Sequence, residues 1–237
     1  MGGFRKLKEQ VRLVLSADDW RDRAKELDAQ PTAALVGPLF SLLLAPREDV
    51  RWRAVTLLGA TVARMATQDM EAARVVMRRF MWHMNEESGN VGWGIPESMA
   101  ETMARHEGLA REFHRKLASY VQCLDCLGDD NYMDHPPLRR AVYWGLGRLA
   151  QVRPELVRHA LPDLLKALIS ENDPASRGFI CWTIGLVGEP EHAAALESLL
   201  RDASPVDLFR DGELEHTTLG ALAAEAHTAL TRQSPLQ

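Results

Sequence analysis

The sequence is poor in cysteine and in long apolar runs, and each shortage excludes a class of protein. Three cysteines among 237 residues are too few, and odd in number, for the disulfide framework of a small secreted domain. The longest uncharged apolar run, from Pro31 to Pro46, is broken by Gly37 and Pro38 and is too short to cross a membrane. We therefore expect a soluble cytoplasmic chain with reduced thiols.

The chain also lacks an excess of basic residues. It has 28 lysines and arginines against 33 aspartates and glutamates, which gives a net charge of -5 and a pI of about 5.9. A field of this sign does not attract nucleic acid, so only a local basic patch could bind it.

Strand signals are absent, whereas apolar residues recur at helical spacing. Leu161, Leu164, Leu165 and Leu168 form one such set. The pattern predicts an all-α protein.

A ten-residue frame recurs along the chain. Its best copy, Leu138 to Gly147, has an apolar residue, an arginine, two variable positions, and then small or apolar residues that end in Leu-Gly. The frame fits again at 50–59 and 176–185, and weaker copies begin at Val91 and Leu214. The starts are separated by 41, 47, 38 and 38 residues. Periods near forty are typical of solenoids that stack helix pairs.

This period predicts one repeat domain over residues 1–237, with a helical cap at 1–30, five helix pairs at 31–230 and a tail at 231–237. The amphipathic helix from Phe4 to Leu15 could lie on a membrane, but we expect it to cover the first repeat. The first helices of the five pairs are expected at about 32–45, 69–85, 109–127, 154–169 and 190–203.

Equivalent positions of the frame predict details of the packing. Leu58, Leu146 and Ile184 should be core residues. Gly59 and Gly147 should lie inside helices, where neighbouring helices approach closely.

The frame itself resembles a known repeat. With arginine at its second position and Leu-Gly or Ile-Gly at its end, the frame that begins at Val50, Leu138 and Ser176 resembles HEAT repeats, and among them the short bacterial kind called phycobilisome-lyase-like. The resemblance covers about Pro31 to Leu230. It implies an all-α, HEAT-like α-solenoid, a right-handed superhelix whose second helices line a concave side.

The resemblance also implies a ladder of arginines and turn acids, but it does not fix a function. The expected members are Arg51, Arg139 and Arg177 with Asp49, Asp134 and Asp173. HEAT arrays serve as scaffolds, bilin lyases, metal hydroxylases and DNA glycosylases, so function has to be argued from a site.

Three long connections interrupt the repeats, at 86–96, 128–137 and 204–212, and such loops are either binding loops or neutral insertions. The first combines two acids, three glycines and an aromatic residue. Trp93, Glu97 and Glu101 follow at i, i+4 and i+8, which on one helix would direct an aromatic surface and two carboxylates into one groove.

Four tryptophans share positions in the frame. Trp52 and Trp93 occupy the third position, and Trp144 and Trp182 the seventh. Two interpretations stay open, an aromatic furrow on the concave side or a core between repeats.

These observations predict a non-catalytic binding or scaffold module without a cofactor, which binds a protein partner or a small cationic ligand. The residues expected to bind it are Glu86, Glu87, Trp93, Glu97, Arg139, Trp144 and Trp182.

Two alternatives use the same region. A cofactor- or metal-handling enzyme could have its site between Glu86 and Glu101, where His83, Glu97 and Glu101 are the best candidate metal ligands. Nucleic-acid binding of the HEAT-like glycosylase kind would need arginines such as Arg139 to form a basic groove.

A zinc site is a weaker possibility. Cys123 and Cys126 would need Cys181 and His135 to complete the four ligands, and buried free thiols are favoured instead.

Overall fold

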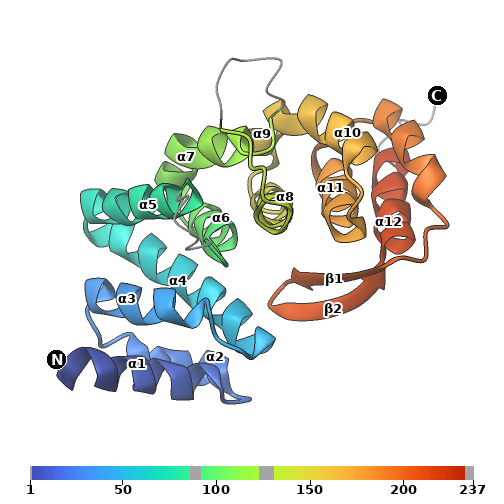
Figure 1. Ribbon diagram of the computed structural model, residues 1–237. Helices are drawn as coiled ribbons and strands as arrows, with labels where there is room; N and C mark the ends of the chain where they lie inside the picture. Colours follow the sequence, from blue (N-terminus) through green and yellow to red (C-terminus); the bar gives the residue numbers. More distant parts are fainter. Residues whose placement is uncertain (1, 86–91, 123–130, 233–237) are drawn as a thin grey trace. The chain divides into compact units, whose positions relative to one another are not determined.

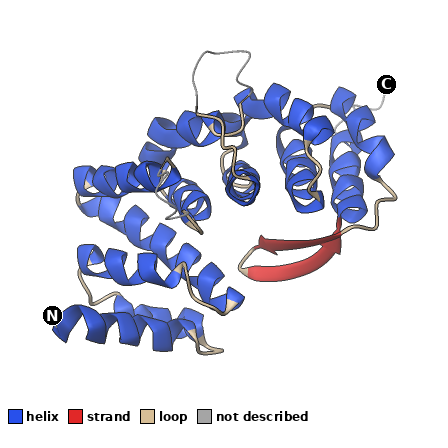
Figure 2. Cartoon of the chain, in the orientation of Figure 1, coloured by secondary structure: helices blue, strands red, loops and turns tan. Residues whose placement is uncertain are grey.

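The protein is mostly helical, as predicted (Figures 1 and 2). A computed structural model describes residues 2–85, 92–122 and 131–232. No helix within these ranges is both long and apolar enough to cross a bilayer.

The contacts divide the chain into two compact units, Met1–Ala110 and Arg111–Gln237. Each unit is described separately below. The expectation of one repeat domain over the whole chain stays a prediction.

Unit 1 begins with a cap and continues with stacked helices. Its elements are α1 (Gly2–Leu15), α2 (Trp20–Arg23), the 3-10 helix η1 (Ala24–Leu27), α3 (Thr32–Leu42), α4 (Glu48–Gln68), α5 (Met70–Met84) and α6 (Ile95–Arg105). The next helix, α7 (Glu107–Ser119), begins at the end of this unit. Helix α1 packs on α3 and buries Val11, Val14 and Leu15. The predicted capping helix is therefore confirmed.

Unit 2 contains the strongest copies of the frame. Its elements are α8 (Pro136–Ala150), α9 (Pro154–Val157), the 3-10 helix η3 (Arg158–Ala160), α10 (Leu161–Ser170), α11 (Pro174–Val187), the 3-10 helix η4 (Pro190–Leu199), β1 (Pro205–Arg210), β2 (Glu213–Thr218) and α12 (Leu219–Arg232). Helix α11 packs against α8 on one side and against α12 on the other. It is the central helix of the unit (Figure 1).

The packing predicted from the frame is confirmed. Leu58, Leu146 and Ile184 are all buried. Gly59 lies inside α4, and a methyl group there would meet the Cβ atom of Glu101 on α6. Gly147 lies inside α8 in the same way, against a side chain of α11. The second helices therefore approach so closely at these glycines that a methyl group would clash.

A β-hairpin at residues 205–218 was not predicted. Strands β1 and β2 pair antiparallel, from Pro205 with Thr218 to Arg210 with Glu213 (Figure 2). The weak copy of the frame that begins at Leu214 is wrong, because its first five residues lie in β2 and only the rest begin α12. The hairpin lies on the amino-terminal halves of α11 and α12, where Val206 and Leu222 both approach Gly178.

The first helix of the last pair is also unusual. Residues 190–199 form a 3-10 helix, η4, in which Ala193, Leu196 and Leu199 are buried at every third position. This straight stripe packs against α12.

Candidate functional site

Two of the predicted binding residues, Trp144 and Trp182, lie in the core of unit 2. The indole Nε1 of Trp144 donates a hydrogen bond of 2.7 Å to the backbone carbonyl of Phe209. The ring of Trp182 packs against Gly147. Both side chains are buried. Of the two interpretations left open, the core between repeats is therefore correct for this pair, and the predicted contact with a ligand is wrong for both.

Arg139 is likewise engaged inside unit 2. Its Nε and Nη2 atoms lie 2.5 and 3.2 Å from the two carboxylate oxygens of Glu171. Its Nη1 atom donates to the carbonyl of Met133 at 2.7 Å, and the Tyr143 hydroxyl donates to Glu171 at 3.0 Å. The hydrogen bonds that Arg139 donates to Glu171 raise the pKa of Arg139, and burial raises the pKa of Tyr143. This network braces α8 against the segment before α11.

The ladder implied by the resemblance is different in detail. Asp173 caps its own helix by accepting hydrogen bonds from the amide and hydroxyl of Ser176, at 3.0 and 2.7 Å. Arg177 donates to the carbonyl of Leu168 at 3.2 Å. Glu171, two residues before Asp173, takes the role of acid partner instead.

The helical geometry on which the predicted groove at the start of α6 was based is not present among the described residues. Helix α6 begins at Ile95, after Gly94 in a left-handed conformation with φ 72°, so Trp93 lies outside the helix. Helical spacing therefore does not relate Trp93 to Glu97 and Glu101. Trp93 is 44% exposed, whereas Glu97 is half-buried and Glu101 is buried, with an oxygen 3.1 Å from Arg105.

The predicted metal chemistry has little support. Within the described ranges, no group of three or more histidines, cysteines, aspartates or glutamates is arranged to hold a metal ion, so His83, Glu97 and Glu101 do not form one. Cys181 is buried, and burial raises the pKa of its thiol to about 12. Four further candidates lie outside the described residues: Glu86, Glu87, Cys123 and Cys126.

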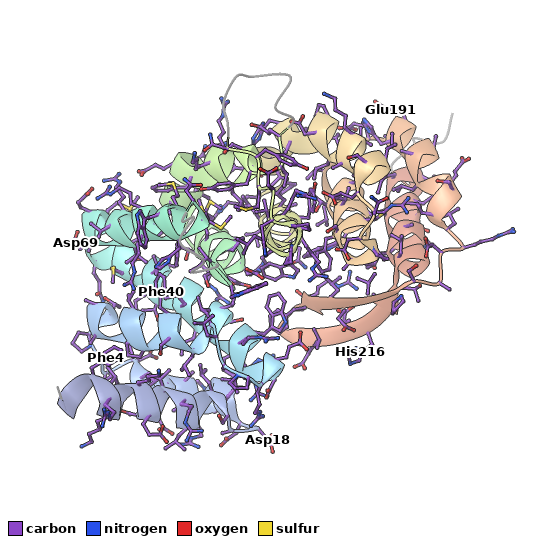
Figure 3. The ribbon with its side chains drawn as sticks, viewed as in Figure 1. Phe4, Asp18, Phe40, Asp69, Glu191 and His216 are labelled. Carbon is purple, nitrogen blue, oxygen red and sulfur yellow. The ribbon has the colours of Figure 1, made fainter. Side chains whose placement is uncertain are left out.

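An aromatic cluster occupies the surface of unit 1 instead. Trp82, near the end of α5, is 60% exposed and makes an edge contact with His83, with ring centroids 5.0 Å apart. The imidazole lies 5.6 Å from the ring of Phe40 on α3, which is labelled in Figure 3 and stacks on the buried Phe80 at 5.3 Å. The guanidinium of Arg79 lies 4.1 Å above the Phe40 ring.

Trp93 leaves the backbone beside this cluster. A methyl group on Gly92 would lie 3.0 Å from the carbonyl oxygen of His83, so the two backbones touch. Trp82 precedes His83 and Trp93 follows Gly92, and neighbouring Cα atoms are about 3.8 Å apart. The backbones of Trp82 and Trp93 are therefore each one residue away from the contact between His83 and Gly92. We call Phe40, Arg79, Trp82, His83 and Trp93 the tryptophan patch.

Comparison with known proteins identifies the repeats. The model of the HEAT-like repeat family matches residues 136–187, which begin at the first residue of α8 and end at the last residue of α11. An uncharacterized protein of Archaeoglobus fulgidus is 30% identical over 192 residues, which cover 79% of this chain and 92% of the archaeal protein. The chain belongs to the same family as this archaeal protein. It is a HEAT/armadillo-type repeat protein.

A solved structure of a repeat protein agrees with this fold. A designed armadillo repeat protein matches 96% of the chain and 92% of its own, with a TM-score of 0.51 and 16% identity. A crystal structure of an engineered protein covers 96% of this chain and 97% of its own, with a TM-score of 0.49 and 14% identity.

Sequence reasoning missed two features of this HEAT/armadillo-type repeat protein, Trp82 and the hairpin. Trp82 belongs to a first helix and so falls outside the repeated frame. A signal was present, because Val75 and Trp82 are apolar at i, i+7 on a face of α5 that otherwise carries Arg78 and Arg79. Both side chains of this apolar pair are exposed, at 54% and 60%.

Proposed function

We propose that this protein is a non-catalytic binding module whose unit 1 recognises a protein partner through the tryptophan patch. Repeat solenoids of this type are typically protein-binding scaffolds. The observation that carries the proposal is the exposure of Trp82 and Trp93, at 60% and 44%, on the two sides of one backbone contact.

The composition of the patch supports protein recognition. Tryptophan and arginine are the residues most enriched among those that contribute strongly to protein–protein binding. Trp82 is held by His83, which contacts Phe40, and Phe40 is in turn stacked on the buried Phe80. A side chain positioned in this way loses little conformational entropy on binding.

The charge of the patch favours a protein over a small cation. Acids in the loop before α6 favoured a cationic ligand, whereas the described residues of the patch include the cation Arg79 and no carboxylate. An apolar protein surface with a carboxylate or carbonyl opposite Arg79 would complement it.

The proposal is tested by capturing partners from native cell extracts with the wild-type chain and with variants of the patch, and by comparing what each binds. Trp82→Ala and Trp93→Ala should each weaken binding of the purified partner at least about tenfold, which corresponds to roughly 1.4 kcal/mol. Ile169→Ala is the matched control, because Ile169 is an apolar residue of α10 that is 87% exposed and belongs to unit 2. Circular dichroism checks that all variants remain helical.

If the double variant Trp82→Ala, Trp93→Ala is folded and its affinity for the partner is within about twofold of the wild type, the proposal is contradicted. Metal analysis of the same preparation tests the enzyme alternative, which a stoichiometric metal would favour.

We also propose that the repeats are of the short bacterial phycobilisome-lyase-like kind, which the Arg and Leu-Gly frame supports. We further propose that the module is cytoplasmic, which the buried reduced Cys181 supports.

A further inference from the structure

The hairpin of unit 2 has a defined pattern of backbone hydrogen bonds. Its two-residue turn consists of Asp211 with φ 54° and Gly212 with φ 88°, the left-handed pair of a type I′ turn. In such a hairpin the residues that flank the turn, Arg210 and Glu213, form a hydrogen-bonded pair. This pair fixes which backbone groups point inward.

Hydrogen-bonded and non-hydrogen-bonded pairs alternate along an antiparallel ladder. One step beyond the strands, the amide of Leu219 donates to the carbonyl of Ser204 at 3.0 Å, which agrees with this alternation. The amide and carbonyl groups of Leu214 and His216 therefore point away from β1, toward the outer edge of β2.

The outer edge of β1 is partly occupied by contacts within unit 2. Its carbonyl at Phe209 accepts the hydrogen bond from the buried indole of Trp144. Pro205, at its start, has no amide to offer.

The outer edge of β2 is open. Among the residues that the structure describes, no group is hydrogen-bonded to the outward amides or carbonyls of Leu214 and His216. The side chain of His216 is 78% exposed and projects away from the helices of unit 2 (Figure 3). An added strand would find these backbone groups accessible.

The hairpin is held in place by side chains on both strands and at its tip. Arg210 forms two hydrogen bonds with Glu215, of 3.0 and 2.8 Å, and one of 2.7 Å with Glu225 on α12. Gln151 lies 3.4 Å from Asp211 at the turn. An edge fixed in this way is organised before a strand binds.

The charge of the hairpin selects the kind of strand. Residues 205–218 contain four acids and one arginine, which gives a formal charge of -3 with neutral histidine. This net negative charge favours an added strand that carries basic side chains.

The same charge disfavours a second copy of this chain. A two-fold pairing of β2 with itself that aligns Leu214 with Leu214 or with His216 places Glu215 opposite Glu213 or Glu215 of the other copy. Like charges directly opposite one another destabilise a sheet.

We propose that the outer edge of β2 binds an extended basic peptide segment of another protein by strand addition. The backbone of Leu214 and His216 supplies the hydrogen bonds, and the net charge of -3 on the hairpin favours lysine or arginine in the added strand. This surface belongs to unit 2 and is separate from the tryptophan patch, so Trp82→Ala leaves it unchanged.

A short labelled peptide of alternating lysine and valine is the probe. It should bind the full chain in fluorescence anisotropy at low salt, and a matched peptide with glutamate in place of lysine should bind at least about tenfold more weakly. Methylating alternate backbone nitrogens of the lysine peptide removes donors without changing its charge, and it should abolish binding.

Two measurements on the protein locate the site. In amide hydrogen exchange, the peptide should protect Leu214 and His216, whereas Glu215 and Thr217 are already protected by β1. His216→Pro removes one outward amide and should weaken binding about tenfold, while His216→Thr keeps that amide and should bind within about twofold of the wild type. Tryptophan fluorescence, which includes Trp144 beside the hairpin, checks that each variant is folded.

Equal binding of the methylated and unmethylated peptides would overturn the proposal, as would protection of other amides in place of Leu214 and His216. If the amides of Leu214 and His216 become more protected as the protein concentration rises, without any peptide, a second copy of the chain occupies the edge. That result would also overturn the proposal. If His216→Pro does not fold, the methylated peptide and hydrogen exchange on the wild-type chain decide the question.

Discussion

Replacing Gly147 by alanine tests the close packing of unit 2. An alanine inside a helix is about 1 kcal/mol more favourable than a glycine, so helix propensity alone would make the variant more stable. The new methyl carbon, however, would lie 2.5 Å from Cζ3 of Trp182 and closer still to Cε3. Carbon atoms pack best at about 3.5–4.0 Å, so the ring or the helix has to move by roughly 1 Å.

That movement is opposed by the surroundings of Trp182, which is buried and rigid. Overpacking of a core typically costs about 1–3 kcal/mol and here outweighs the gain in propensity. We expect Gly147→Ala to lower the free energy of unfolding by about 1–2 kcal/mol, measured by urea titration followed by circular dichroism.

Two comparisons make this prediction specific. Gly3→Ala in α1 is the control, because a methyl group there meets nothing within 4 Å, and it should be neutral or slightly stabilising. In a Trp182→Leu background the cost of Gly147→Ala should disappear, since the ring that causes the clash is gone. An unchanged cost in that background, or a Gly147→Ala variant as stable as the wild type, would refute the reasoning.

Two further predictions concern buried side chains of unit 2. Glu171→Gln removes the counter-charge of the Arg139 guanidinium, and the Glu171 side chain is only 8% exposed. The variant should therefore lower the free energy of unfolding by about 3 kcal/mol. The exposed control Glu191→Gln should change it by less than about 0.5 kcal/mol in the same urea titration. Burial raises the thiol pKa of Cys181 to about 12, so iodoacetamide at pH about 8 should leave Cys181 unmodified in the folded chain and modify it after unfolding. Mass spectrometry of the peptide that contains Cys181 measures the modification. Rapid modification of the folded chain would contradict the burial of Cys181.

The helical stack could be predicted from the sequence because its repeated frame encodes close contacts. Leu146 and Gly147 are neighbours in sequence with different roles, one filling the core and the other allowing the next helix to approach. Both roles require a particular side-chain size, so both recur in the frame at Leu58 and Gly59.

The side of the helix that faces solvent could not be predicted in the same way. Trp144 and Trp182 share the seventh position of the frame. The same spacing is expected for a buried core between repeats and for an exposed aromatic surface, so it does not distinguish them. Trp93 was placed on a helix by its position in the frame, although Gly94 delays the start of α6. Local backbone geometry of this kind is not encoded in a repeat period.

The hairpin was missed because the forty-residue period was extended to Leu214. A local signal contradicted that period, since Asp211 and Gly212 form a favoured two-residue turn between Val206 and Leu208 on one side and Leu214 on the other. Where a strong turn and a weak repeat compete, the turn is the better predictor, because it depends on neighbouring residues only.

The 3-10 helix η4 has a consequence for the length of the last repeat. A 3-10 helix rises about 2.0 Å per residue and an α-helix about 1.5 Å, so the 10 residues of η4 span roughly 20 Å and the 14 residues of α12 roughly 21 Å. The tighter winding lets a shorter segment cover the full length of its partner helix. An α-helix of that reach would need about four more residues, and these would have to come from the stretch that now connects to the hairpin.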